Sequence, residues 1–305
     1  NVAVALAQFG HHAVHVTRLP ESALGDRIAL ELRGLGVDLR WVTRGPERAG
    51  LNFVERGVSQ RPSTVLYDRS GSAFAACGDG DFPWTTILEA AHAFHVSGIT
   101  PALSASCAEH AVTALTEARR RGLLTSLDVN HRRKLWTSDA ARPRLEALAR
   151  LADLLIVNEE DAEVVFGIRP EQGDYRTGRL SREAYAEVAR RLAETYGCRF
   201  VAITLRESHS SSFNGWAGLL FEAATGQACL STPYDIQVLD RVGSGDAFAA
   251  GLLHGLLTGM DPQGAVEFAA AAGCLKHSIE GDLLLASAAE VQRLAAGEAS
   301  GRVQR

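Results

Sequence analysis

Residues 240–256 read DRVGSGDAFAAGLLHGL, a glycine-rich turn that leads into a long apolar run typical of a buried helix. The acid that opens the apolar run, Asp246, follows the loop residues Gly243, Ser244 and Gly245. Backbone N–H groups at the start of a helix have no partner inside it and lie at the positive end of its dipole, so they can bind an anion. Glycines let a phosphate approach that backbone closely. Asp246 is therefore either a helix cap or a base that takes a proton from a hydroxyl attacking phosphorus.

Outward from this stretch, short apolar runs alternate with helical patterns. The runs suit strands that are buried on both faces of a parallel sheet, and they lie at 12–17, 92–98, 123–130, 153–158 and 199–204. Helical patterns fill 103–122 and 181–197, and two more helices meet at GMDP, residues 259–262. Strand followed by helix, repeated, predicts an α/β fold with a mainly parallel central sheet.

One segment breaks the alternation. Residues 50–76 read as two or three strands with glycine-rich turns and no helix, which predicts a small inserted sheet that acts as a lid. Otherwise we expect one domain over residues 1–305. The opening NVAVALAQFG lacks an initiator Met, so we expect this domain to be incomplete at its N-terminus.

The composition excludes several classes of partner. The net charge is −5, with basic and acidic residues well mixed, which gives no electrostatic reason to expect nucleic acid or an anionic membrane. No apolar run reaches transmembrane length. The 5 cysteines are far apart and form no C-x-x-C pair, which indicates free thiols in a reducing compartment, and we expect the cytoplasm.

The stretch D-R-V-G-S-G-D-A-F-A-A-G resembles the C-terminal signature of the ribokinase-like sugar kinases, in which the acid is the catalytic base. The resemblance extends over nearly the whole chain, through NVAVALAQFG, GDRIALELRGLGVD, HVSGITPALS and SLDVNHRRKLW in the family's order. It implies a three-layer fold with helices on both sides of the sheet. It also implies that Asp246 is the base, that the amides of 243–246 hold the developing charge, and that Asn1 lies in the sugar site.

Three stretches resemble the 2-keto-3-deoxygluconate kinase branch of that family. DVNHRRKLW fits D-x-N-x-R-x-x-L-W, with Asp128, Asn130, Arg132 and Trp136, while VLYDRSGSA supplies Tyr67 and Arg69, and KHSIEGD begins at Lys276. An arginine fork pairs bidentately with a carboxylate, which a keto-deoxy acid carries and a neutral sugar lacks. The resemblance therefore implies that Tyr67, Arg69 and Arg132 bind a sugar acid. Phe53 lies where relatives often carry a tyrosine near the sugar, so its aromatic face is a further candidate contact.

The nucleotide side departs from the family pattern. IVNEEDAEVVFG resembles the N-x-x-E segment that organises Mg²⁺ around ATP, but Asn158 is followed at the third position by Asp161, with Glu160 before it, and either acid could serve. Where many relatives have a glycine-rich strand end, Thr204 is kept and LRES follows, so Arg206 is a candidate phosphate contact. Gly243, Gly245 and Lys276 complete the implied ATP site. No G-x-x-x-x-G-K-[ST] occurs, which excludes a P-loop kinase.

The sequence thus predicts an ATP- and Mg²⁺-dependent kinase for the 6-hydroxyl of 2-keto-3-deoxygluconate. Two alternatives stay open: a kinase of the same fold for 2-ketogluconate, fructose or a nucleoside, and a non-catalytic homologue that binds a sugar. The edges of an exposed lid sheet often pair with a second subunit, so we also expect a homo-oligomer through the lid.

Overall fold

The computed structural model describes residues 1–170 and 181–298. Within these residues the central sheet has seven strands, in the order β10-β9-β8-β7-β6-β5, with β11 also paired to β9. Four of the predicted apolar runs form its parallel part, because these segments are buried on both faces. The strands are β5 Ala93–Ser97, β6 Leu124–Asp128, β7 Leu154–Asn158, β8 Phe200–Ser208, β9 Phe213–Glu222, β10 Gln227–Leu230 and β11 Tyr234–Gln237.

The sheet is more mixed than the alternation of strand and helix suggests. Strands β5 to β8 are parallel, whereas β9 runs antiparallel to β8, and β10 and β11 both run antiparallel to β9. After β8 the chain forms a long hairpin instead of crossing over through a helix. The parallel half is the part that carries the predicted site residues at its carboxyl edge.

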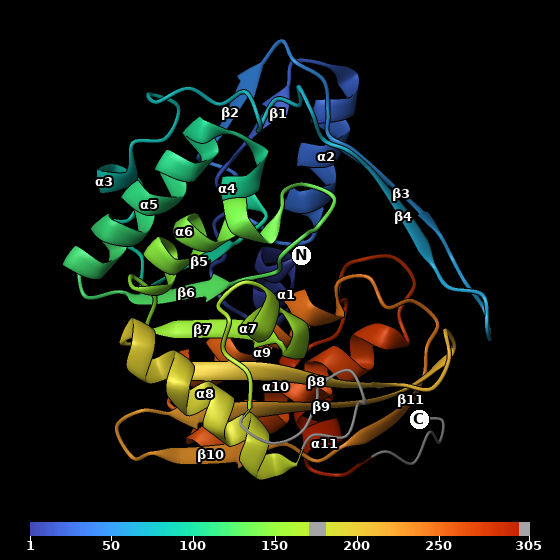
Figure 1. Ribbon diagram of the computed structural model, residues 1–305. Helices are drawn as coiled ribbons and strands as arrows, with labels where there is room; N and C mark the ends of the chain where they lie inside the picture. The colour runs from blue at the N-terminus through green and yellow to red at the C-terminus, as the bar shows by residue number, and fades with distance from the viewer. Residues whose placement is uncertain (171–180, 299–305) are drawn as a thin grey trace.

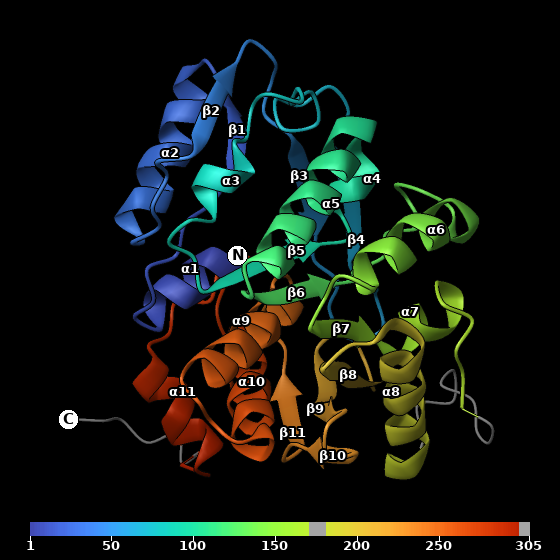
Figure 2. The same ribbon diagram turned by 90° about the vertical axis from the view of Figure 1, so that its left-hand side faces the viewer.

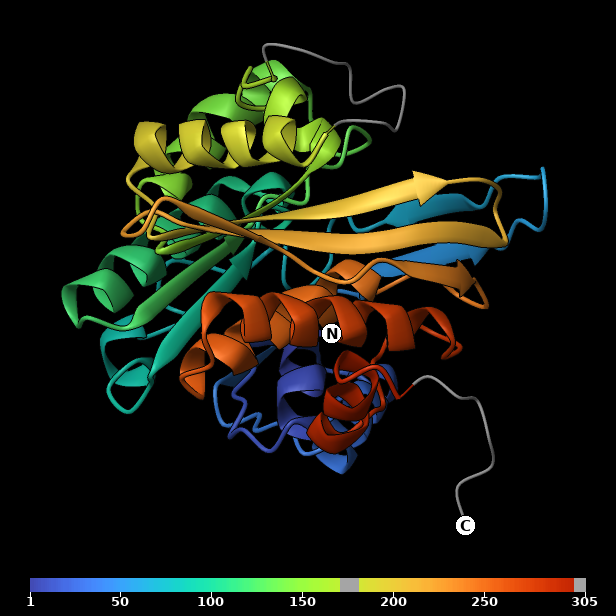
Figure 3. The ribbon, with the colours of Figure 1, turned by 90° about the horizontal axis from the view of Figure 1, so that it is seen from below.

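Helices cover both faces of the sheet, which gives the three layers expected (Figure 3). Alternate residues of β7 face opposite ways: Leu155 and Val157 belong to the core that includes Leu115 of α5, and Ile156 belongs to the core with Phe248 of α9. The helices of the first face are α5 Ala105–Arg120, α6 Ser138–Ala149 and α8 Arg182–Tyr196, and those of the second are α9 Ser244–Leu257 and α10 Pro262–His277.

The ends of these helices follow the expected local signals. Ser181 caps α8 by accepting a hydrogen bond from the backbone N–H of Ala184, and Gly197 ends it at a φ of 75°. Helices α9 and α10 lie so close that a Cβ on Gly251 would be 2.6 Å from the Cα of Ala269. The small residues Gly251 and Ala269 therefore serve the close packing of this helix pair.

A smaller part of the chain packs around the N-terminal helix. Strands β1 and β2 pair in parallel, and Figure 2 shows them with α2 above α1. The predicted strand at 12–17 is wrong for most of its length, because only Thr17 belongs to β1 and Val14 makes an isolated bridge to Asp38. The elements are α1 Val2–Gln8, β1 Thr17–Pro20, α2 Ala23–Gly34 and β2 Val42–Gly45, and the remaining short helices are α3 Trp84–Ile87, α4 Thr100–Leu103, α7 Glu159–Val164 and α11 Ala288–Ala295.

The predicted inserted sheet is present as two antiparallel strands, β3 Leu51–Glu55 and β4 Thr64–Asp68. In Figure 1 this ribbon lies along the right-hand side of the molecule. Most of its residues are exposed, and its tip is held by hydrogen bonds to the loop after β8, where the backbone N–H of Ser211 donates to the carbonyl of Ser59 at 2.8 Å. A segment with so few buried residues can move over a site once these tip contacts open.

Cys77, Cys107, Cys198, Cys229 and Cys274 are all free. Among the helices of residues 1–170 and 181–298, none has the length and apolar character needed to cross a membrane.

Candidate active site

The glycine loop begins the buried helix α9, as the sequence predicts. Gly243 precedes the helix with a φ of 83°, a conformation that favours glycine, and a Cβ at this position would be 2.0 Å from the carbonyl oxygen of Asp282. No described side chain caps α9. The start of the helix is therefore shaped by backbone, with the amides of its first turn next to the acid.

Asp246 lies on that first turn and is half-buried. Its Oδ2 accepts a hydrogen bond of 2.7 Å from Nδ2 of Asn1. Helix α1 packs against α9 through Ala5 and Ala247. This packing brings Asn1 and Asp246 together from opposite ends of the chain. The predicted sugar-site residue Asn1 and the predicted base are thus in direct contact.

Asp128, at the carboxyl end of β6, opens the D-x-N-x-R-x-x-L-W motif, but the sequence interpretation gave it no role in the site. Burial raises the pKa of its carboxyl to about 8, the negative charges of Asp246 and Asp161 add to the shift, and Arg132 opposes it. The carboxyl groups of Asp128, Asp161 and Asp246 and the guanidinium of Arg132 therefore lie close enough to affect the charge of Asp128. The signal that could have found Asp128 is its position at the carboxyl end of a parallel strand, where α/β sheets bind ligands.

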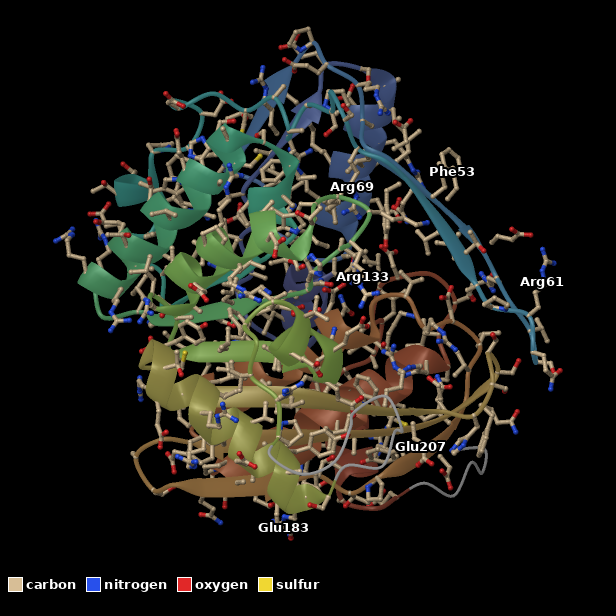
Figure 4. All side chains as sticks on the ribbon, in the orientation of Figure 1. Phe53, Arg61, Arg69, Arg133, Glu183 and Glu207 are labelled. Carbon is tan, nitrogen blue, oxygen red and sulfur yellow. The ribbon has the colours of Figure 1, made fainter. Side chains whose placement is uncertain are left out.

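The lid and the loop after β6 bring the predicted sugar-acid residues together. The guanidinium of Arg69 lies over the Tyr67 ring, 4.5 Å from its centroid. Burial lowers the pKa of Arg69, Tyr67 opposes this shift, and the positive charge of Arg132 adds to it. Lys134 also ties the loop to the lid, because its Nζ donates to the carbonyl of Val65 at 2.6 Å. Figure 4 shows Arg69 at the base of the lid.

Arg132 has a donor ready for a ligand. Its Nε is buried and has no hydrogen-bond partner among the described residues. An unsatisfied buried donor on a charged group costs free energy, which an anion at this position would recover. The arrangement of Arg132 with Arg69 therefore suits a ligand carboxylate.

Phe53 is not brought to this site. Its backbone neighbour across the lid is Leu66, whereas Tyr67 pairs with Asn52, so Phe53 and Tyr67 lie on opposite faces of the two-stranded sheet. Phe53 is 57% exposed, and Figure 4 shows it on the side of the lid that points away from the body. The expected aromatic contact with a sugar is absent from the described arrangement of this chain.

On the nucleotide side, the ends of β7 and β8 lie together. Asn158 is in register with Thr204, and its Oδ1 accepts the backbone N–H of Asp161 at 2.6 Å, which caps α7. Arg206 extends beyond them on β8, with its guanidinium carbon 5.5 Å from the Trp216 ring centroid. These residues line one edge, as the resemblance implies.

Lys276 lies apart from this edge. It is fully buried, and its Nζ donates to the carbonyl of Ile279 at 2.8 Å. Burial lowers the pKa of Lys276, while Asp240 and Asp282 raise it. The structure therefore places this lysine behind the glycine loop, where it holds a turn, and not at a surface open to a nucleotide.

The three acids after Asn158 have three different surroundings. Glu159 accepts a 2.5 Å hydrogen bond from the Tyr185 hydroxyl, exposed Glu160 forms an ion pair with Arg133, and Asp161 is buried. Within residues 1–170 and 181–298 no three His, Cys, Asp or Glu side chains are grouped to hold a metal ion. Mg²⁺ commonly binds through phosphates and water with one or two carboxylates, so one acid is sufficient here.

A carboxylate on the first turn of a helix that begins at a glycine loop, together with an exposed two-stranded insertion, is an arrangement suited to phosphoryl transfer. The chain belongs to the pfkB family of carbohydrate kinases, whose sequence model matches residues 1–283. This membership confirms the predicted family and the ribokinase-like fold.

Individual relatives agree with the family. The crystal structure of 2-dehydro-3-deoxygluconokinase from Thermotoga maritima superposes with a TM-score of 0.92 at 45% identity, and the match covers 97% of this chain and 89% of that one. The 2-dehydro-3-deoxygalactonokinase of Haloferax volcanii is 32% identical over 99% of this chain and 87% of its own length. The 2-dehydro-3-deoxygluconokinase of Bacillus subtilis is 29% identical over 93% of this chain and 80% of its own length.

Proposed function

We propose that this chain transfers the γ-phosphoryl group of ATP to the 6-hydroxyl of 2-keto-3-deoxygluconate. The observation that carries the proposal is the pair Arg69 and Arg132, whose positive charges lie close enough to affect each other, and of which Arg132 has a buried Nε without a partner among the described residues. A sugar acid fits this arrangement because its carboxylate can bind the arginines while its far hydroxyl reaches the base. The names of the relatives from Thermotoga maritima and Bacillus subtilis support the same substrate.

In the proposed reaction Asp246 accepts the proton of the attacking hydroxyl. Its hydrogen bond with Asn1 holds the carboxylate in one orientation, which is the condition for an efficient positioned base. The amides of 243–246 face the transferred phosphoryl group and stabilise its developing negative charge. Closure of the lid brings Tyr67 and Arg69 onto the sugar acid and excludes water.

Mg²⁺ and the nucleotide belong at the edge formed by Asn158, Thr204 and Arg206. Glu160 and Asp161 are both candidates to hold Mg²⁺, and Glu160 is the one whose carboxylate is exposed. Bound Mg²⁺ supplies neutralisation of phosphate charge. Its site can be tested by titrating Mg²⁺ at saturating ATP in Glu160→Gln, which should need more Mg²⁺ for half-maximal rate if Glu160 holds the ion.

The substrate can be tested by ADP release on a panel of sugars. We expect the highest kcat/KM with 2-keto-3-deoxygluconate and a lower value with 2-ketogluconate, fructose and a nucleoside. The galactonate epimer belongs in the panel because the Haloferax volcanii relative is named for it. A preference for a neutral sugar would refute the sugar-acid assignment, and absence of ADP release with every sugar would favour a non-catalytic sugar-binding protein.

We also propose that the lid mediates self-association. Its outer face carries Leu51, Phe53 and Leu66, which are 40%, 57% and 58% exposed, so an apolar strip faces solvent in the monomer. Such strips mark interaction surfaces, and an open strand edge beside one favours pairing. Sedimentation velocity should show an oligomer for the wild type and a monomer for Leu66→Asp. A monomeric wild type would refute this assembly. A cytoplasmic location stays a prediction, and it is consistent with the free thiols.

A further inference from the structure

Asp161 uses one carboxylate oxygen to join two segments of the site. Its Oδ2 accepts the backbone N–H of His131 at 3.1 Å and Nδ2 of Asn158 at 3.0 Å. His131 belongs to the loop after β6, whereas Asn158 ends β7 and caps α7. Asp161 as a whole residue is only 4% exposed, so these hydrogen bonds are made away from water. A carboxylate in this position connects the sugar side with the nucleotide side.

The loop after β6 is held at two points just before Arg132. Nδ2 of Asn130 donates to Oγ of Ser97 at 3.3 Å, and the next amide, that of His131, donates to Asp161. Asn130 has a φ of 40°, an uncommon backbone conformation for a residue other than glycine. The surroundings must therefore hold this turn in place, and the residue that leaves it is Arg132.

The neighbouring acids do not share this role. Glu159 is engaged by Tyr185, which lies on α8. Glu160 does contact the loop after β6, but only through the exposed side chain of Arg133. Asp161 is thus the acid of α7 that accepts a backbone N–H of that loop from a buried position.

We propose that Asp161 is a positioning residue for the sugar site, because its buried carboxylate fixes the His131 amide and so places the guanidinium of Arg132 for the substrate carboxylate. The proposal rests on the proposed function, in which Arg132 binds that carboxylate. It assigns to Asp161 a role in sugar binding that is separate from any contact with Mg²⁺. A small displacement of such a group lowers catalysis strongly even when the charge is kept.

One feature makes the two roles separable. Because the same oxygen accepts both hydrogen bonds, the amide oxygen of Asp161→Asn can accept them as well. Asp161→Glu keeps the charge but moves the oxygen by one methylene group in a buried place. If Asp161 acts by positioning, the geometry of its accepting oxygen matters most, so Asp161→Asn should keep more activity than Asp161→Glu. Binding of Mg²⁺ depends on a carboxylate, so it would favour Glu over Asn.

The experiment measures kcat, the KM of the sugar acid, the KM of ATP and the Mg²⁺ concentration for half-maximal rate. We expect Asp161→Ala and Asp161→Glu to raise the KM of the sugar acid by roughly 10- to 100-fold, with Asp161→Asn within about threefold of wild type. The KM of ATP and the Mg²⁺ requirement should change by less than about threefold in all variants. Glu163→Gln, a charge-removing change on the same helix, is the matched control and should match wild type.

Two results would overturn the proposal. One is a raised Mg²⁺ requirement with an unchanged KM for the sugar acid, which would make Asp161 a metal ligand. The other is an Asp161→Glu variant that outperforms Asp161→Asn, a comparison that stands even if Asp161→Ala does not fold. Failure of the proposed function is distinct, because it would be seen in the wild type as a lack of activity on sugar acids.

Discussion

Replacement of Arg132 by lysine should lower activity on a sugar acid much more than activity on a neutral sugar. Lysine keeps the positive charge, so the repulsion from Arg69 is little changed. It loses the guanidinium Nε, the buried donor that has no partner among the described residues. The substitution therefore removes one of two parallel hydrogen bonds to a carboxylate and leaves the net charge unaltered.

The size of the effect follows from that single lost contact. A hydrogen bond between charged groups contributes about 1.5–3 kcal/mol, which corresponds to roughly 10- to 150-fold in kcat/KM. A neutral sugar offers no carboxylate, so its kcat/KM should change little. The ratio of kcat/KM for 2-keto-3-deoxygluconate to that for fructose should fall by the same factor.

The assay is ADP release with each sugar at saturating ATP and Mg²⁺. Arg190→Lys is a suitable control, since Arg190 is an exposed arginine of α8 that pairs with Glu194. A ratio that is unchanged in Arg132→Lys would show that Arg132 does not bind the carboxylate. The kinase activity itself would be unaffected by that result.

Four further results are expected. Asp246→Asn should lower kcat by about 10²–10⁴-fold with little change in Tm, because its amide oxygen still accepts from Asn1 while a base is lost; unchanged kcat would make Asp246 a structural residue. Gly243→Ala should destabilise by at least about 1–2 kcal/mol from its φ of 83° alone, seen as a lower Tm; an unaltered Tm would contradict this. Amides of 51–68 should exchange faster without the sugar acid than with it, and equal protection would argue against a moving lid. Burial raises the pKa of Asp128 from 3.8 to about 8, so between these pH values the folded protein keeps a proton on Asp128 that the unfolded chain has lost. The wild type should therefore lose stability relative to Asp128→Asn between pH 5 and pH 8 in urea unfolding, and parallel pH profiles would oppose this.

The fold was predictable where local pattern and environment agree. Strand β7 and the first half of β8 are continuous apolar runs because both of their faces are buried against helices. The segment at 12–17 has a similar apolar content but lies beside a small sheet, so pairing begins only at Thr17. The long β8–β9 hairpin was not evident, since an antiparallel strand buried on both faces reads like a parallel one.

The site divides in the same way. Gly243 and Asp246 are recognisable because a turn and a helix start are encoded within a few residues. The face of the lid on which Phe53 lies cannot be recognised from the sequence. A register shift of one position in a two-stranded sheet moves every side chain to the other face, and the lid packs no face against the core that would fix the register. The hydrogen bond that Asp161 accepts from the His131 amide could not be predicted, because the two residues are 30 positions apart and no local sequence pattern indicates their contact.

The contact between Asn1 and Asp246 has a consequence for how the enzyme becomes competent during synthesis. The two residues are 245 positions apart. At about 5–20 residues per second, roughly 12 to 50 s pass on the ribosome between them. By then β5 to β8 have been made, whereas contacts of such large sequence separation form slowly. A nascent chain whose α9 has not docked would leave one face of that sheet uncovered and would lack the contact between Asn1 and Asp246. Activity on the ribosome should therefore be acquired in one late step, when α9 docks against both the sheet and α1.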